Sequence, residues 1–277
     1  MSQIAKLTSV DTYYEDHRPG GDLSPSEPVL LLHGNPDSAR LWRGVVDRLS
    51  PPYRCLTPDL PGFGRSAAAP SFDCSLEAMV RWVDELLGAA GVDGRVHLVV
   101  HDFGGPYGLA WAVRNPERVR TIAATNTLFF EQYRWHAWGR IWRAPILGEI
   151  SSLLMNRWLF DRELRRGSRR LHRDHLDATW EFVTPATKRM VLRLYRATDP
   201  SVFAGWEEPL RDLMGRVPSR AFWGVHDPYI TPEWAHRLGA QKVVLFDDCG
   251  HWLPAEDPAG LAEGLLELFA EARGGKA

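Results

Sequence analysis

The chain has 277 residues, of which 44% are hydrophobic and 25% are charged, enough apolar material for one domain with a sizeable core and an insertion. Lys and Arg number 33 against 35 Asp and Glu, so the formal net charge is -2. This balance argues against nucleic acid or an anionic membrane surface as the main partner, because both attract proteins with a clear basic excess. A small-molecule substrate fits the composition better.

The cysteines and the start of the chain indicate a reducing compartment. Cys55, Cys74 and Cys249 make an odd number without the spacing of a disulfide framework. The first ten residues lack the apolar stretch of a signal peptide, and no apolar run approaches the roughly 18 to 20 residues that span a bilayer. We therefore expect a soluble cytoplasmic protein without a membrane partner, as a monomer or a homodimer.

Short apolar runs rich in β-forming residues alternate with amphipathic segments through the first half of the chain. This alternation is typical of a parallel sheet with helices on both faces. In chain order we expect a strand over 28–34, a helix over 41–49, a strand over 53–60, a helix over 76–91, a strand over 95–102, a helix over 104–114 and a strand over 119–127. The predicted fold class is α/β, with a doubly wound, mostly parallel sheet.

The texture of the sequence changes at about residue 128. From 128 to 217 the chain is helical in pattern, rich in Trp and Arg, and without strand signals, so this part does not belong to the sheet. Strand signals resume at 219–227 and 243–248, with a helix over 232–238 between them and a last helix over 258–272. The sequence thus predicts a core domain of residues 1–127 and 218–277 and an inserted helical cap, or lid, of residues 128–217.

Asp102 stands between a predicted strand and a predicted helix and is followed by Gly104 and Gly105, which permit a sharp turn and close helix packing. That is the setting of a nucleophile elbow. An alternative is that Asp102 only caps the helix, since Asp is a favoured N-cap residue. Two other strand ends favour catalysis, because Asp227 ends a later strand and His251 follows the last one. Nucleophile, acid and histidine in this order are the hydrolase arrangement.

These residues lie in specific motifs: His33-Gly-Asn-Pro36 followed by Leu41-Trp-Arg43, Asp59-Leu-Pro-Gly-Phe-Gly-Arg-Ser66, His101-Asp-Phe-Gly-Gly105, Trp223-Gly-Val-His-Asp227, Gly250-His-Trp252 and, in the cap, Leu194-Tyr-Arg196. Over nearly its whole length the chain resembles the α/β-hydrolases of the haloalkane dehalogenase and epoxide hydrolase group. The resemblance implies an α/β-hydrolase fold and an enzyme that uses an aspartate nucleophile.

The chemistry of substitution at a saturated carbon explains an aspartate in this place. A serine would leave a stable ether on the enzyme, whereas a carboxylate, ionised at neutral pH with an ordinary pKa of about 4, leaves an ester that water can cleave. His251 is then free to activate that water, and Asp227 orients the imidazole. The resemblance and their places after a strand and at a helix start imply that the backbone N–H groups of Asn35 and Phe103 are the oxyanion donors.

The leaving group separates the two subfamilies. Haloalkane dehalogenases stabilise the halide with two side-chain N–H donors, commonly an Asn in the first motif, present here as Asn35, and a Trp after the nucleophile. Phe103 occupies that second place and has no N–H. A cap tryptophan, Trp135, Trp138 or Trp142, is expected to substitute for it, with packing as the alternative role of each.

Epoxide hydrolases need an acid to protonate the opening alkoxide, usually two cap tyrosines. Tyr195 matches the second of these, and Tyr133 is a candidate for the first, but Asn35 departs from the bulky residue usual at its place in that subfamily. We therefore expect a haloalkane dehalogenase, with an epoxide hydrolase as the alternative. The substrate is expected to be a small apolar haloalkane or epoxide that reacts with water.

Two further alternatives have less support from the residues. Fluoroacetate dehalogenases clamp a substrate carboxylate with arginines where this chain has Phe103 and Pro106, and some proteins of this fold are small-molecule receptors with idle catalytic residues. Some dehalogenases carry their acid where Asn126 stands, which leaves Asp227 in that role. No residue spacing matches a metal site and no Gly-rich loop matches a dinucleotide fingerprint, so no cofactor is expected.

Overall fold

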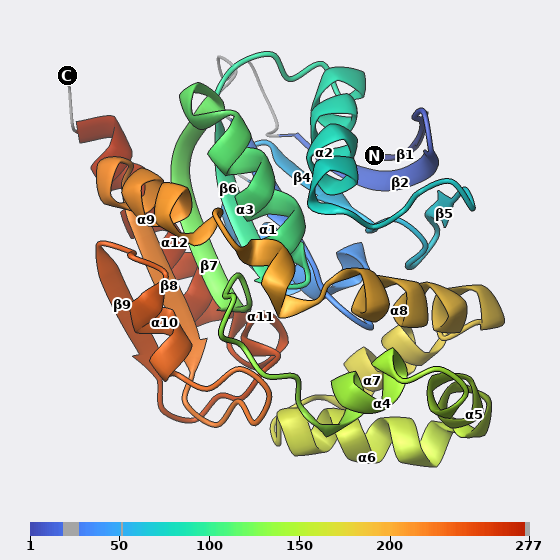
Figure 1. Ribbon diagram of the computed structural model, residues 1–277. Coiled ribbons are helices and arrows are strands. Elements are labelled where there is room, and N and C mark those ends of the chain that lie inside the picture. Colours follow the sequence, from blue (N-terminus) through green and yellow to red (C-terminus); the bar gives the residue numbers. More distant parts are fainter. Residues whose placement is uncertain (19–27, 51, 275–277) are drawn as a thin grey trace.

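The computed structural model describes residues 1–18, 28–50 and 52–274 (Figure 1). Within these residues, nine strands form one sheet in the order β1-β2-β4-β3-β6-β7-β8-β9, with β5 paired to β2. The strands are β1 (Ser2–Lys6), β2 (Val10–His17), β3 (Val29–Leu32), β4 (Cys55–Pro58), β5 (Ala67–Ala68), β6 (Val96–Asp102), β7 (Val119–Thr127), β8 (Ser219–Gly224) and β9 (Lys242–Phe246).

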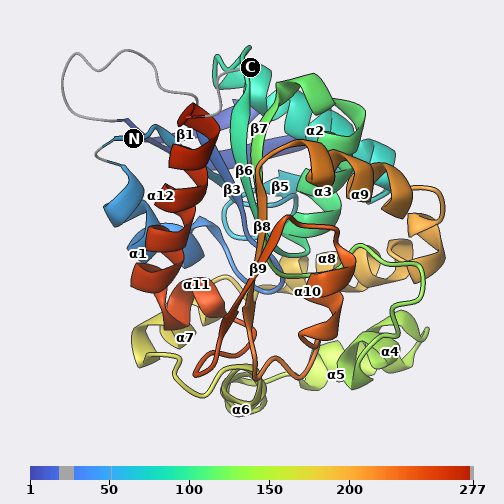
Figure 2. The same cartoon turned by 90° about the vertical axis from the view of Figure 1, so that its left-hand side faces the viewer.

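The neighbouring strands β4, β3, β6, β7, β8 and β9 run parallel, and β6 lies near the centre of this part with all of its residues buried. Helices cover both faces, as the edge-on view in Figure 2 shows. On one face lie α1 (Arg43–Leu49), α11 (Leu253–Glu256) and α12 (Pro258–Gly274), and on the other α2 (Leu76–Ala89), α3 (Gly104–Arg114), α9 (Glu207–Arg216) and α10 (Glu233–Arg237). The predicted doubly wound, mostly parallel sheet is confirmed.

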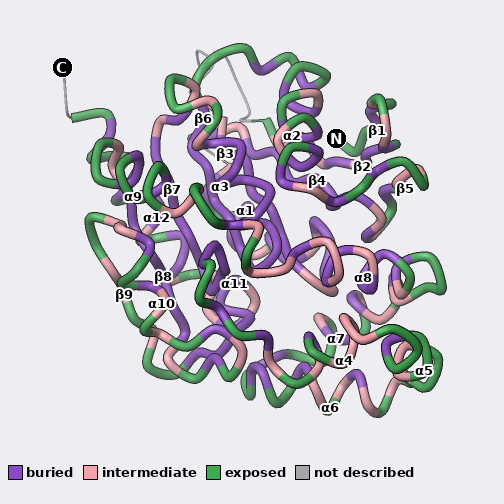
Figure 3. Tube along the Cα trace, in the orientation of Figure 1, coloured by how far each residue is buried: buried purple, intermediate pink, exposed green. Residues whose placement is uncertain are grey.

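A hydrophobic core lies on each face of the sheet, which is why the central strands are continuous apolar runs without alternation. Figure 3 shows the central strands buried along their length. The antiparallel strands β1 and β2 on one side of the sheet have no counterpart among the elements predicted from the sequence. Only every second residue of β2 is fully buried, so its apolar signal is weaker than that of a central strand.

Helices follow β7 where the texture of the sequence changes. They are α4 (Ala137–Arg143), α5 (Leu147–Leu154), α6 (Arg157–Gly167), α7 (Arg173–Trp180) and α8 (Pro185–Ala197), with 3-10 helices at Ala39–Trp42, Pro116–Arg118 and Pro200–Phe203 elsewhere in the chain. Helices α4 to α8 gather beyond the carboxyl ends of the parallel strands (Figure 1). We call these five helices, together with residues 133–136 that lead into them, the cap.

Helix α9 also lies within the stretch predicted as cap, but it packs against α3 on the face of the sheet. Its residues Leu210, Leu213 and Met214 are buried in the core cluster of that face. The last helix of the stretch 128–217 predicted as cap thus covers the sheet together with α3. Within the described part of the chain, no helix is both long and apolar enough to cross a membrane.

The start of α3 approaches the neighbouring strand so closely that only glycine fits there. A Cβ at Gly104 would lie 2.3 Å from the carbonyl oxygen of Leu32 at the end of β3, an overlap that the backbone must relieve by moving. Gly88 in α2 is a matched contrast, because a Cβ there would meet no atom within 4 Å.

We expect Gly104→Ala to lower the free energy of unfolding by about 3 kcal/mol, as overpacking does. Gly88→Ala should raise it by roughly 0.5 to 1 kcal/mol, because alanine restricts the unfolded chain and favours helix. Guanidinium denaturation followed by circular dichroism measures both. A Gly104→Ala protein as stable as the wild type would show that α3 does not need this close approach.

Candidate active site

Asp102 is the last residue of β6, and α3 begins two residues later. Its backbone has a φ of 47°, in the left-handed region that residues other than glycine rarely adopt. The sharp turn brings its buried carboxylate to the carboxyl edge of the sheet. Asp102 does not cap α3, since the N-cap residue is Phe103 and no side chain accepts a capping hydrogen bond there.

Two backbone N–H groups hold the carboxylate of Asp102. The N–H of Asn35 donates to Oδ1 at 2.7 Å, and the N–H of Phe103 is a second donor. The loop that carries Asn35 is fixed from behind by His33, whose Nε2 accepts from the N–H of Leu60 at 2.9 Å. The proton of that imidazole is therefore on Nδ1, which donates to the carbonyl oxygen of Gly34 at 2.8 Å.

His251 connects the carboxylate of Asp102 with that of Asp227. Its Nδ1 lies 2.8 Å from Oδ2 of Asp227, and its Nε2 lies 3.6 Å from Oδ2 of Asp102. The three residues come from the ends of three parallel strands, as their order in the sequence predicts. Their side chains are almost completely buried, so their charges are weakly screened by solvent.

The carboxylate of Asp227 is held by further donors. Its Oδ1 accepts from the backbone N–H groups of Tyr229 at 2.7 Å and Ile230 at 3.0 Å. Its Oδ2 accepts from the side-chain amide of Asn126 at 2.8 Å, in addition to His251. The sequence identifies Asn126 only as the position at which some dehalogenases carry their catalytic acid. In the structure, the amide of Asn126 instead holds the carboxylate of Asp227 in place.

Burial and charge act in opposite directions on the pKa of both reactive groups. Burial lowers the pKa of His251, but the charge of Asp227, its hydrogen bond and the charge of Asp102 together raise that pKa above the ordinary 6.5. Burial raises the pKa of Asp102 above its ordinary value, against the opposing effects of His251 and the two N–H donors. The imidazolium and the carboxylate therefore stabilise each other in a site from which water is largely excluded.

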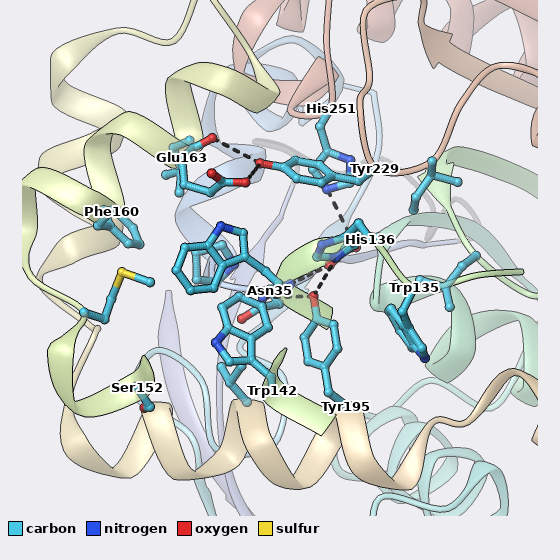
Figure 4. Close-up of a pocket in the computed structure, with 18 of the residues that line it drawn as sticks. Asn35, Trp135, His136, Trp142, Ser152, Phe160, Glu163, Tyr195, Tyr229 and His251 are labelled. Atoms are coloured by element: carbon cyan, nitrogen blue, oxygen red, sulfur yellow. Dashed lines mark hydrogen bonds and ion pairs between the residues drawn. The ribbon is translucent and has the colours of Figure 1, made fainter. Parts of the chain in front are cut away.

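A cavity opens above these residues, between the core and the cap (Figure 4). The polar side chains around it are Asn35, Asp102 and His251 of the core and His136, Ser152, Glu163, Lys188 and Tyr195 of the cap. Most other side chains around it are apolar or aromatic: Leu128, Tyr133, Trp135, Trp138, Trp142, Met155, Phe160, Leu164, Val183, Val191, Tyr229, Ile230 and Trp252. The reactive carboxylate thus faces a compartment suited to an apolar substrate.

The sequence from residue 27 to residue 175 matches the protein family described as alpha/beta hydrolase fold. The chain belongs to this family. The predicted fold class is thereby confirmed, and so is the resemblance to the haloalkane dehalogenase and epoxide hydrolase group, which the relatives below support. The protein is an enzyme of the α/β-hydrolase fold.

Three relatives illustrate the range of the family. A cis-3-alkyl-4-alkyloxetan-2-one decarboxylase from Xanthomonas campestris pv. campestris is 40% identical over 274 residues, which cover 90% of this chain and 89% of that protein. Haloalkane dehalogenase 2 from Mycobacterium tuberculosis is 26% identical over 260 residues and 90% of both chains. The crystal structure of a haloalkane dehalogenase loop variant from Bradyrhizobium elkanii is 21% identical, with a TM-score of 0.82, and covers 99% of this chain and 97% of its own.

The cap residues expected to complete this α/β-hydrolase site differ in where their polar atoms lie. The hydroxyl of Tyr133 donates to the backbone carbonyl of Tyr229 at 3.0 Å. Trp135 stacks on Phe103 with 5.8 Å between ring centroids, and its buried Nε1 has no partner. Figure 4 shows that nitrogen on the side of the ring turned away from Asn35. Trp135 therefore fills space beside Phe103 without directing its N–H at the reactive carboxylate.

The remaining predicted cap residues line the cavity. Trp138 stacks on Trp142 with 5.7 Å between ring centroids. The hydroxyl of Tyr195 lies 3.4 Å from Nδ2 of Asn35, directly at the site. Its other neighbour is His136, whose Nε2 lies 3.5 Å away, a residue that the sequence analysis did not single out. Nothing in the local sequence around His136 distinguishes a cavity residue from a helix cap.

We expect Asp227→Asn to lower the pKa of His251 by about 1 to 3, because it removes the nearest negative charge while burial continues to disfavour the imidazolium. The imidazole signals of His251 in a pH titration by NMR measure this change. Asp248→Asn, at a side chain 86% exposed, is the control and should leave that pKa unchanged. An unchanged pKa in Asp227→Asn would mean that Asp227 does not stabilise the charged ring.

Proposed function

We propose that the enzyme opens cis-3-alkyl-4-alkyloxetan-2-ones with Asp102 as the nucleophile and releases carbon dioxide and a cis-alkene. The relative that is 40% identical over 90% of this chain carries that activity in its name. The observation that carries the proposal is the leaving-group side of the cavity. There a hydroxyl, that of Tyr195, lies beside Asn35 in place of an indole N–H.

A halide and a carboxylate require different surroundings as they leave. The halide site expected from the sequence needs a second side-chain N–H beside Asn35, but the side chain of Phe103 has none and the N–H of Trp135 is turned away from Asn35. The two other candidates, Trp138 and Trp142, stack on each other in the wall of the cavity. A hydroxyl that donates a hydrogen bond suits an oxygen leaving group, such as the ring oxygen of a strained lactone. This difference favours the lactone over the haloalkane.

In the first step, the carboxylate of Asp102 attacks the saturated ring carbon that is bonded to the ring oxygen. The new bond is an ester between Asp102 and that carbon, and the bond from the carbon to the ring oxygen breaks. The ring oxygen keeps the electron pair and becomes part of a carboxylate. The N–H of Asn35 holds Oδ1 of Asp102 during the attack, and the N–H of Phe103 is a second donor to this carboxylate.

In the second step, the bond between the new carboxylate and the adjacent carbon breaks and carbon dioxide leaves. Its electron pair forms the double bond, and Asp102 departs as a carboxylate, so water is neither consumed nor formed. Attack from the back places the ester oxygen opposite the carboxylate, while both alkyl groups stay on the same side. Elimination from this arrangement gives the cis-alkene.

His251 has a different role in this reaction from the one it has in ester hydrolysis. No water needs to be deprotonated, and the protonated ring 3.6 Å from Asp102 stabilises the carboxylate that reappears in the second step. The raised pKa of His251 supports this role, because it keeps the ring protonated to a higher pH. Asp227 orients the ring and neutralises its charge.

We expect a purified wild-type enzyme to convert a cis-3,4-dialkyl oxetanone to alkene and carbon dioxide, and to form no hydroxy acid when the reaction runs in water labelled with heavy oxygen. Gas chromatography with mass spectrometry detects both products. Asp102→Ala should abolish the reaction. A labelled hydroxy acid as the product would contradict the proposal, because it would mean that water cleaves the lactone.

Haloalkane hydrolysis, the function expected from the sequence, is the second candidate, and the amide of Asn35 in the cavity favours it. The test is to incubate the His251→Phe variant with bromobutane and to measure the mass of the peptide that contains Asp102. If bromide is displaced, the variant should hold a butyl ester on the peptide that contains Asp102, visible as a mass increase, because no base activates water. With the oxetanone, the same variant should hold no stable ester, because loss of carbon dioxide releases Asp102. Diol formation from an epoxide would instead support the epoxide hydrolase alternative.

The two reactions should also differ in their dependence on pH. Hydrolysis requires neutral His251, so its rate falls as the pH falls through the raised pKa of that ring. Oxetanone decarboxylation requires no base, so its rate should not fall over the same range. Initial rates from pH 6 to pH 9, with Asp102→Ala as the blank, measure the difference. A decarboxylation rate that falls together with the neutral fraction of His251 would contradict the assigned role.

A further inference from the structure

Two cap residues and Asn35 meet on one side of the cavity (Figure 4). Tyr195 reaches it from α8, and His136 comes from the residue before α4. The hydroxyl of Tyr195 lies 3.4 Å from Nδ2 of Asn35 and 3.5 Å from Nε2 of His136. Both distances are long compared with the usual 2.7 to 3.2 Å, so these groups bind one another weakly and are available to a ligand.

The position of the proton on His136 follows from its other nitrogen. Nδ1 accepts a hydrogen bond from the N–H of Gly139 at 3.3 Å and thereby caps α4. A nitrogen that accepts carries no proton, so the neutral ring has its proton on Nε2. Burial lowers the pKa of His136 to about 4, and the ring is therefore neutral at pH 7. Nε2 of His136 is therefore an N–H donor, and it lies next to the hydroxyl of Tyr195 in the lining of the cavity.

The hydroxyl of Tyr195 is a second donor. The hydroxyl oxygen faces the Nε2–H of His136 and the amide N–H of Asn35, which are both donors to its lone pairs. The hydroxyl proton has no acceptor among these two groups and can be donated to a ligand. Burial, and then the charge of Asp102, raise the pKa of Tyr195 well above 10, so the hydroxyl keeps that proton. The ring is fixed by Phe103, with 4.8 Å between ring centroids.

We infer that His136 and Tyr195 form a carboxylate-binding subsite for the group that leaves when the lactone opens, each donating a hydrogen bond to one of its two oxygens. The inference rests on the proposed function for the identity of that carboxylate. Two separate donors suit a group with two oxygens, whereas a halide is a single centre that needs both donors at one point. Esterification of Asp102 in the same step removes the negative charge that would repel the new carboxylate.

His136 has two nitrogens with different tasks, and two substitutions separate them. Asn keeps an acceptor where Nδ1 caps α4 but has no group at the place of Nε2, while Gln brings an amide N–H to the place of Nε2. We expect His136→Asn to lower kcat for the oxetanone roughly 10- to 100-fold, the value of a hydrogen bond to a charged group, and His136→Gln to stay within about threefold of the wild type.

The ratio of kcat between the Gln and Asn variants decides the inference. A ratio near one or below one would overturn the inference, because the only role of His136 would then be to accept the hydrogen bond at the start of α4. His172→Asn is the matched control, and its kcat should equal that of the wild type. His172 is the N-cap residue of α7, but its side chain is exposed and makes no hydrogen bond to that helix. Thermal unfolding of each variant shows whether a loss of activity is a loss of folded protein.

A binding experiment tests the subsite even if the wild type does not turn over the oxetanone, which would overturn only the proposed function. Asp102→Asn replaces the carboxylate with a neutral group, as in the ester. In that protein, His136→Asn should weaken the binding of octanoate about tenfold or more and leave the affinity for octanamide unchanged. His136→Gln should leave the affinities for both ligands unchanged. Titration calorimetry measures the six affinities, those of both ligands for Asp102→Asn alone and with each substitution of His136. Equal weakening of octanoate and octanamide by His136→Asn would overturn the inference.

Discussion

A buried carboxylate must be surrounded by hydrogen-bond donors, and the structure around Asp102 is arranged to supply them. The left-handed backbone at the end of β6 directs the side chain toward the loop of Asn35 and the first turn of α3, which each contribute one N–H. Gly34 lies so close that a Cβ there would be 2.3 Å from Oδ1 of Asp102. Strand, loop and helix start are thus packed into one unit, and His251 completes it from the other side.

The parts of the fold that were predicted correctly are those with a local cause. The bounds of α3 and β7 agree with the prediction, because each is a continuous apolar run between turn residues. The three strand-end residues were also found from their order alone, since the carboxyl ends of parallel strands share one edge. β1 and β2 were missed because only some of their residues are buried, which gives a weak apolar signal. The packing of α9 against α3 was not predicted because it depends on tertiary contacts alone.

The donors of the cavity could not be predicted for a similar reason. Trp135 and Tyr195 were candidates on their residue type, but the sequence does not tell in which direction an indole N–H or a hydroxyl points. His136 carries no motif, and its interest arises only where α4 and α8 bring it to Tyr195. In the proposed function, the core supplies the nucleophile and the cap supplies the groups that stabilise the leaving group. Under that proposal, changes in the cap helices alter leaving-group preference while the nucleophile and its partners stay the same.

The proposed role of His136 and Tyr195 also has a consequence for product release. A halide is still an anion after it has been displaced, and donors that stabilise its departure also retain it. A carboxylate held by the same two residues ceases to exist when it becomes carbon dioxide, an uncharged linear molecule that accepts hydrogen bonds poorly. In the proposed reaction, the chemical step therefore removes the anion that the two donors bind, and no ion has to leave the apolar cavity with the products.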